Sequence, residues 1–146
     1  MNQKHHVSQT IAKQLAEAGI VIESESQWEV GGKLSGKQNA TLVLRNRPPS
    51  FVSADSAWSF YPAPIATELL EIMPAVLKVT DTGVGLNDYA CLEIQKYCSG
   101  EKIYGVLYSL GEDIAYYKEV GLEEYSPTLP DALALLLIRL TKDGLI

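Results

Sequence analysis

Residues that could do chemistry are scattered along this sequence and form no recognised catalytic or cofactor motif. His5 and His6 are adjacent, but neighbouring imidazoles without more distant ligands make a poor metal site. The stretch Gly83–Val84–Gly85 lacks the third glycine and the following helix of a dinucleotide loop, and it lacks the Lys-Ser/Thr pair of a phosphate loop. We therefore expect a turn at these glycines, no metal site and no cofactor.

Paired carboxylates are present, but general acid–base catalysis requires them to share a cleft and to differ in pKa. The pairs are Glu68 with Glu71, Glu112 with Asp113, and Glu123 with Glu124. Because they lie in predicted turns or on the polar side of a predicted helix, we expect them to be solvated. There is no G-x-S-x-G motif, and no histidine lies near Cys98 in sequence to activate its thiol. We assign no catalytic residue and favour a protein that is not an enzyme.

Tyrosine is the residue type whose distribution suggests a contact surface. Seven of the eight tyrosines lie within residues 89–125. Tyr104 and Tyr108 share one face of a predicted strand, whereas the neighbours Tyr116 and Tyr117 must point to opposite faces of theirs. Exposed tyrosines give a large contact area at low entropic cost, so these four are candidate protein-contact residues. The alternative is ordinary strand propensity with half-buried rings.

A second candidate site is the aromatic loop, or ragged edge strand, predicted over residues 49–62. Trp58 and Phe60 lie there among prolines, and such side chains can line the pocket of a small-ligand-binding protein or of an enzyme. They can instead cover the core beneath a long loop. The sequence leaves both readings open.

The strongest helix signal is TLPDALALLLIRL, residues 128–140. Thr128 fits the N-cap, Pro130 the first turn and Asp131 the third position of a capping box, and Gly144 fits the C-terminal end. Leucine surrounds this helix on nearly all sides, so other elements must cover more than one of its faces. We expect it at the centre of the core.

Two further helices are predicted, over residues 8–18 and 64–73. Gly19 can end the first in a left-handed conformation, and Pro64 fits the first helical position of the second. In the second helix Ile65, Leu69, Ile72 and Met73 form an apolar stripe, which leaves Glu68 and Glu71 facing water.

Period-two patterns predict a hairpin over residues 26–46, with 40–44 as its inner strand, and a meander over residues 75–120 that ends in a strand at 114–120. The loops are too short for crossovers, so the strands are antiparallel. Residues 122–127 are expected to form only a connection. The order of elements predicts a single α+β domain, residues 1–146, with 1–7 as a flexible tail. In it an antiparallel sheet, a hairpin plus a three- to four-stranded meander, packs against about three helices.

Composition limits the classes of partner. The chain has 146 residues and a net charge of −6, which argues against nucleic acid and anionic membranes as partners. No secretory signal and no apolar stretch of ~20 residues is present. Cys91 and Cys98 are expected on opposite faces of one strand, where they cannot bridge, so reduced thiols and a cytoplasmic location are expected.

Two segments carry a resemblance to a known group. YPAPIATELLEIMP (61–74) and LPDALALLLIRLTKDGLI (129–146), separated by a strand meander, resemble small uncharacterised open reading frames in phage and prophage genomes of gut bacteria. The opening helix with Gly19 is similar to theirs, so the likeness in architecture covers most of the chain. A Thr cap expected after Pro64 is replaced by Ile65. The resemblance implies a phage-associated origin and no activity.

These observations predict a non-enzymatic, acidic, cytoplasmic protein-binding accessory domain of phage or prophage type. The alternative is a small-ligand-binding protein or enzyme with a pocket under residues 49–62. An immunity-like or antitoxin-like protein that masks a basic partner is a special case of the first, and its binding would weaken steeply with salt. Homo-oligomer formation through a sheet edge is also open.

Overall fold

The computed structural model describes residues 2–31, 39–45, 58–79, 88–98, 100–101, 103–109 and 122–146. The helical elements are η1 (Gln3–His5), α1 (Gln9–Glu17), α2 (Ala66–Ile72) and α4 (Leu129–Lys142). The strands are β1 (Ser26–Gly31), β2 (Asn39–Leu44), β3 (Ser59–Pro62), β4 (Val76–Val79), β5 (Asp88–Lys96), β6 (Tyr104–Ser109) and β7 (Glu123–Ser126). The predicted turn at 83–85 and the predicted strand at 114–120 lie outside the described residues.

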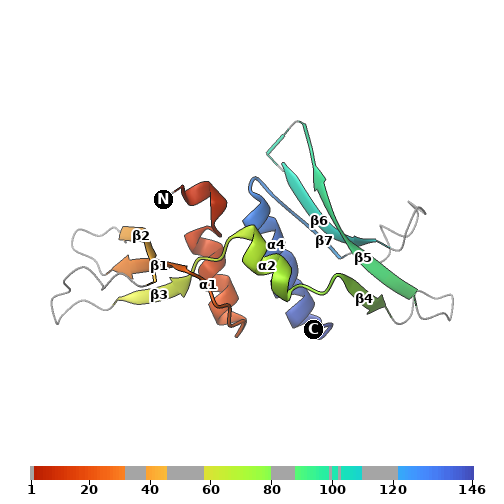
Figure 1. Ribbon diagram of the computed structural model, residues 1–146, viewed down its shortest axis with the longest axis horizontal. Helices are drawn as coiled ribbons and strands as arrows, with labels where there is room; N and C mark the ends of the chain where they lie inside the picture. The colour runs from red at the N-terminus through yellow and green to blue at the C-terminus, as the bar shows by residue number, and fades with distance from the viewer. Residues whose placement is uncertain are drawn as a thin grey trace.

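The described strands form two antiparallel sheets, and the helices lie between them (Figure 1). The first sheet has the order β2-β1-β3 and the second β4-β5-β6-β7. The α+β class and the antiparallel pairing are therefore confirmed, but the hairpin and the meander belong to different sheets. This division follows from α2, which separates β3 from β4 along the chain, and from the apolar surface of α4, which needs cover on several sides.

In the first sheet the central strand is β1, which corrects the expectation that residues 40–44 are the inner strand. Trp28 and Val30 of β1 are buried, whereas β2 is an edge strand that exposes residues 39–41. β3 pairs with the other side of β1, so the predicted ragged edge strand is confirmed for residues 59–62. The third strand explains the difference, because a hairpin pattern does not reveal which of its strands gains a second neighbour.

α4 has the predicted position and cap. The Thr128 side chain accepts a hydrogen bond from the Asp131 backbone N–H at 3.4 Å, and Gly144 follows the helix at φ +68°. Leu133, Leu136 and Leu140 are fully buried, and α4 packs on α1, α2, β6 and β7. The carboxylate of Asp131 does not complete a capping box within α4. It accepts a hydrogen bond at 2.7 Å from the backbone N–H of Ser8, the N-cap residue of α1, and so joins the two helices.

Both remaining helices occur where predicted, with corrections at their ends. Gly19 follows α1 at φ +74° as expected. α2 begins at Ala66 with Ile65 as its N-cap residue, so Pro64 lies outside the helix. Leu69 and Met73 are buried, but Ile72 is exposed.

Three further segments differ from the prediction. Residues 122–127 contain β7, which pairs with β6. Cys98 lies beyond the end of β5, because a hydrogen bond from the Tyr97 N–H to the Ile103 carbonyl closes the chain there; Cys91 and Cys98 are both free and exposed. Val7, the last residue of the predicted tail, is fully buried, and its carbonyl accepts a hydrogen bond from the Trp28 indole at 2.7 Å, whereas residues 2–5 are exposed.

Candidate functional site

The connection from α1 to β1 supplies the first part of the candidate site. After Gly19 the chain reaches β1 without an assigned helix or strand, and the exposure of its side chains alternates: Ile22 and Ser24 are buried, whereas Val21, Glu23 and Glu25 are exposed. The Val21, Glu23 and Glu25 side chains are therefore open to solvent. The same alternation is readable in the sequence IVIESES, residues 20–26.

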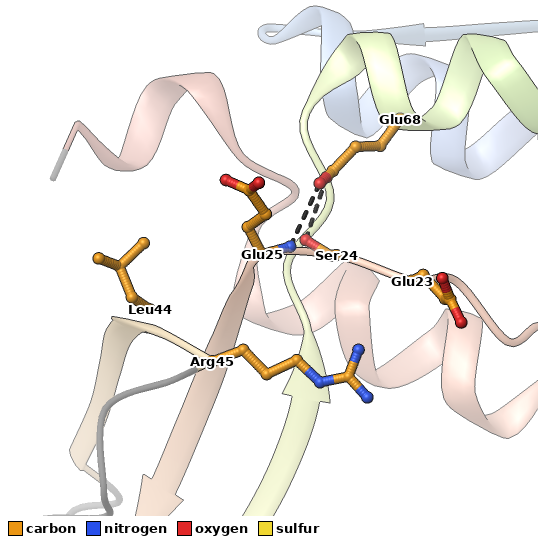
Figure 2. Close-up of a pocket in the computed structure, with 6 residues that line it drawn as sticks. All are labelled: Glu23, Ser24, Glu25, Leu44, Arg45 and Glu68. Atoms are coloured by element: carbon orange, nitrogen blue, oxygen red, sulfur yellow. Dashed lines mark hydrogen bonds between the residues drawn. The ribbon is translucent and has the colours of Figure 1, made fainter.

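Glu68 fixes this segment to α2, instead of facing water as predicted. Its carboxylate accepts hydrogen bonds from the Ser24 hydroxyl at 3.0 Å, from the Glu25 N–H at 3.3 Å and from the Ile65 N–H at 2.8 Å. Figure 2 shows Glu68 reaching from α2 to the Ser24 hydroxyl and to the Glu25 backbone nitrogen. The Glu68 carboxylate is therefore already used by internal donors, which leaves Glu23 and Glu25 as the carboxylates open to a ligand.

Arg45 completes the site from the end of β2. Its backbone N–H donates to the Glu25 carbonyl at 2.7 Å, and no carboxylate of the described residues forms an ion pair with its guanidinium. The depression around it has a volume of about 550 Å³ and is lined by Glu23, Ser24, Glu25, Leu44, Arg45 and Glu68 (Figure 2). Among the described lining residues, three carboxylates and one guanidinium give a formal charge of −2.

A second depression adjoins the first, because Ser24 and Arg45 line both. Its volume is about 240 Å³, and Phe60 and Val21 are among its lining residues. Val21 is 90% exposed, Leu44 51% and Phe60 47%. Apolar side chains thus lie on both sides of the charged groups. We call the exposed set Val21, Glu23, Glu25, Leu44, Arg45 and Phe60 the Arg45 surface.

The two predicted aromatic residues have different positions. Phe60 belongs to the Arg45 surface, whereas Trp58 lines neither of these two depressions. The Trp58 ring packs directly over Gly31, where an added Cβ would lie 2.5 Å from the ring atom Cη2. Trp58 therefore covers the end of β1, which favours the core-covering reading of this residue. Residues 49–57 of the predicted loop lie outside the described residues.

Tyr104 and Tyr108 lie on the face of the second sheet that packs against the helices, which corrects the expectation of an exposed pair. Tyr108 is 2% exposed, and its hydroxyl donates to the Pro74 carbonyl. Burial raises the pKa of Tyr108 to about 12. Tyr104 is half-buried, with the Lys96 Nζ 5.7 Å from its ring centroid. Tyr116 and Tyr117 lie outside the described residues.

Other tyrosines lie on the opposite face of this sheet. The rings of Tyr97 and Tyr125 are 5.9 Å apart and lie over Gly105, where an added Cβ would be 2.9 Å from Tyr125. The Tyr125 hydroxyl donates to Glu123 at 2.9 Å; burial first, and this hydrogen bond second, raise the pKa of Tyr125. Tyr89 on the same face is exposed. Alternation along a strand cannot tell which face is covered, so the sequence could not separate these tyrosines from Tyr108.

The part of the chain that the structure describes contains neither a metal-binding cluster nor a membrane-spanning helix. No group of three or more His, Cys, Asp and Glu side chains there could hold a metal ion. No described helix has the length and apolarity needed to cross a bilayer.

Comparisons with known proteins give no assignment. No family model matches the chain, and neither the curated proteins nor the solved structures contain a match. The resemblance to phage and prophage reading frames therefore stays a prediction.

Proposed function

We propose that this protein is a protein-binding domain, of the accessory type that the phage resemblance implies, and that its Arg45 surface contacts a basic segment of the partner. The observation that carries the proposal is the exposure of Val21 and Phe60 directly beside Glu23, Glu25 and Arg45. Apolar, aromatic and arginine side chains grouped on one surface are the composition from which interface hot spots are built.

The apolar part of this surface supports a macromolecular partner. A single exposed apolar residue is ordinary, but here Val21, Leu44 and Phe60 all border one pair of depressions. They come from the α1–β1 connection, the end of β2 and β3, and the hydrogen bonds of Glu68 and Arg45 hold that connection in place. A fixed surface loses little conformational freedom on binding.

The charged part of the surface supports a basic partner. The described charges at this depression sum to −2 within a chain whose net charge is −6, and both favour the approach of a cationic segment. Glu23 and Glu25 are exposed, so their interaction with such a segment is screened by salt.

The alternative of a small-ligand site is supported less well at these depressions. The one that contains Phe60, at about 240 Å³, is smaller than the roughly 300 Å³ at which typical ligand pockets begin. The larger one has exposed charged side chains rather than apolar walls. A shallow, mixed surface suits a protein better than a small molecule.

The test is a capture experiment on bacterial lysate with matched variants, followed by binding of the purified captured protein. The apolar variant is Val21→Ser/Phe60→Ser, and its control is Val76→Ser/Ile94→Ser, which changes two exposed apolar side chains elsewhere. We expect a protein that the wild type and the control capture and that the apolar variant releases.

Two double variants that remove the same amount of charge test the electrostatic contribution to binding. Glu23→Gln/Glu25→Gln should weaken binding of the captured protein, whereas Glu71→Gln/Glu101→Gln, also at exposed glutamates, should not. Binding should weaken between about 0.05 M and about 0.5 M salt, where the screening length becomes shorter than ~5 Å. A captured protein that is retained equally by all four variants would contradict the proposal.

A further inference from the structure

A third depression lies where four segments meet, and it shares no residue with the Arg45 surface. Its volume is about 330 Å³. It is lined by Lys4, His5, Ala66, Tyr104, Pro127, Thr128, Leu129 and Pro130. These residues belong to η1, to the first turn of α2, to the start of β6, and to the link between β7 and α4 together with the first two residues of α4 (Figure 1). Among them is Tyr104, which the sequence had suggested for a different role.

The walls of this depression are mainly apolar and stiff. The Tyr104 ring, Pro127, Leu129 and Pro130 form most of them. Proline fixes its own φ angle, and Thr128 between the two prolines is held by the hydrogen bond that its side chain accepts from the Asp131 N–H. A ligand with an apolar body could therefore bind without first ordering the site.

The rim is cationic, although the chain as a whole is acidic. Lys4 and His5 are both exposed on η1, and the Lys96 ammonium is held above the Tyr104 ring. None of the lining residues that the structure describes carries a carboxylate. The nearby Asp131 does not line it, and its Oδ1 already accepts the hydrogen bond from the Ser8 N–H.

We infer that this depression binds a small carboxylic acid with an aromatic body. The ring packs against Tyr104 and the prolines, and the carboxylate faces Lys4 and His5. An uncharged ring would gain the apolar contacts alone, and an amine would meet like charge at the rim. The chemistry of the site thus selects anions over cations of the same shape.

The test is an NMR titration of the isotope-labelled full chain with phenylacetate, with phenethylamine and benzyl alcohol as probes of the same ring and different charge. We expect saturable shifts of the backbone amides of Lys4, His5, Ala66 and Tyr104 with phenylacetate, weaker binding of benzyl alcohol, and none of phenethylamine.

Variants separate the two parts of the site. Lys4→Gln/His5→Gln should weaken phenylacetate binding about three- to tenfold, in keeping with the modest strength of exposed charge pairs. Lys13→Gln, an exposed lysine on α1, should leave it unchanged. Tyr104→Leu should weaken phenylacetate and benzyl alcohol alike.

Three results would overturn this inference: no saturable shift with phenylacetate, equal binding of phenethylamine, or unchanged affinity in Lys4→Gln/His5→Gln. Because Lys4 and His5 are exposed, the double variant should fold normally, which its amide spectrum checks. The Arg45 surface is not involved, so either proposal can fail without the other.

Discussion

At the scale of single residues, two carboxylates of this acidic chain act as acceptors for backbone groups far away in the sequence. Glu68 holds Ser24 and Glu25, and Asp131 holds the N-cap residue of α1. Both contacts connect elements that are not neighbours along the chain. Their side chains therefore stabilise the arrangement of segments, whereas Glu23 and Glu25 remain available at the surface.

Replacing Glu68 by Gln should lower the free energy of unfolding by about 1–3 kcal/mol, because an amide cannot accept from all three donors and presents N–H groups to some of them. Glu71→Gln on the exposed side of the same helix should change stability by less than about 0.5 kcal/mol. Urea denaturation followed by circular dichroism measures both. Equal midpoints for the two variants would mean that the Glu68 hydrogen bonds contribute nothing net.

The buried phenol of Tyr108 should make the protein less stable in alkali. Its pKa is raised from 10.0 to about 12, so between these values the folded chain keeps a proton that the unfolded chain loses. The contribution is fully present below pH 10, and it is lost as the pH rises towards about 12. Unfolding measured in urea from pH 9 upward, in steps, should show a shallower decline for Tyr108→Phe. A decline of the same steepness would assign the alkaline loss to other groups.

At the scale of elements, the sequence was sufficient where structure depends on local chemistry. Thr128, Gly144 and Gly19 lie where their capping roles predict, and the hairpin of β1 with β2 follows from alternation and turn residues. The sequence was not sufficient where an element depends on contacts with residues far away along the chain. β7 was missed, because its sequence EEYS has no apolar alternation and its pairing depends on β6.

The candidate site shows the same limit. Phe60 was a candidate pocket residue in the sequence, but its neighbours Arg45 and Val21 come from other segments and have no motif in common with it. Tyr108, which is buried, was kept as a candidate contact residue because period-two alternation does not say which face of a sheet a helix covers. The face that is covered depends on where α4 packs against the sheet, which is a tertiary contact that the strand sequence does not contain.

A charged residue in the buried face of α4 should prevent folding. Leu136→Asp places a carboxylate where the side chain is fully buried, so a cooperative thermal transition should be lost. Leu145→Asp, an exposed leucine after the helix, should melt close to the wild type. A normal transition for Leu136→Asp would show that α4 is not central to the core.

At the scale of the whole molecule, the two sheets do not pair with each other. Any coupling between their unfolding therefore depends on the helices that pack against them. α1 packs on β3 and on α4, and α4 packs on β6 and β7. The first sheet is further tied to the N-terminal segment by the Trp28–Val7 hydrogen bond, and Val7 in turn donates to the Pro64 carbonyl before α2. These contacts predict that both sheets unfold together.

Hydrogen exchange can test this cooperativity at one amide in each sheet, Trp28 in β1 and Val106 in β6. We expect Leu133→Ala, at a fully buried position of α4, to lower the free energy of exchange by about 2–5 kcal/mol at both amides, since the cavity weakens the layer that they share. Leu145→Ala, at an exposed position, serves as the control. If Leu133→Ala affects Val106 and leaves Trp28 protected, the first sheet unfolds independently, and its Arg45 surface could then be studied as a separate unit.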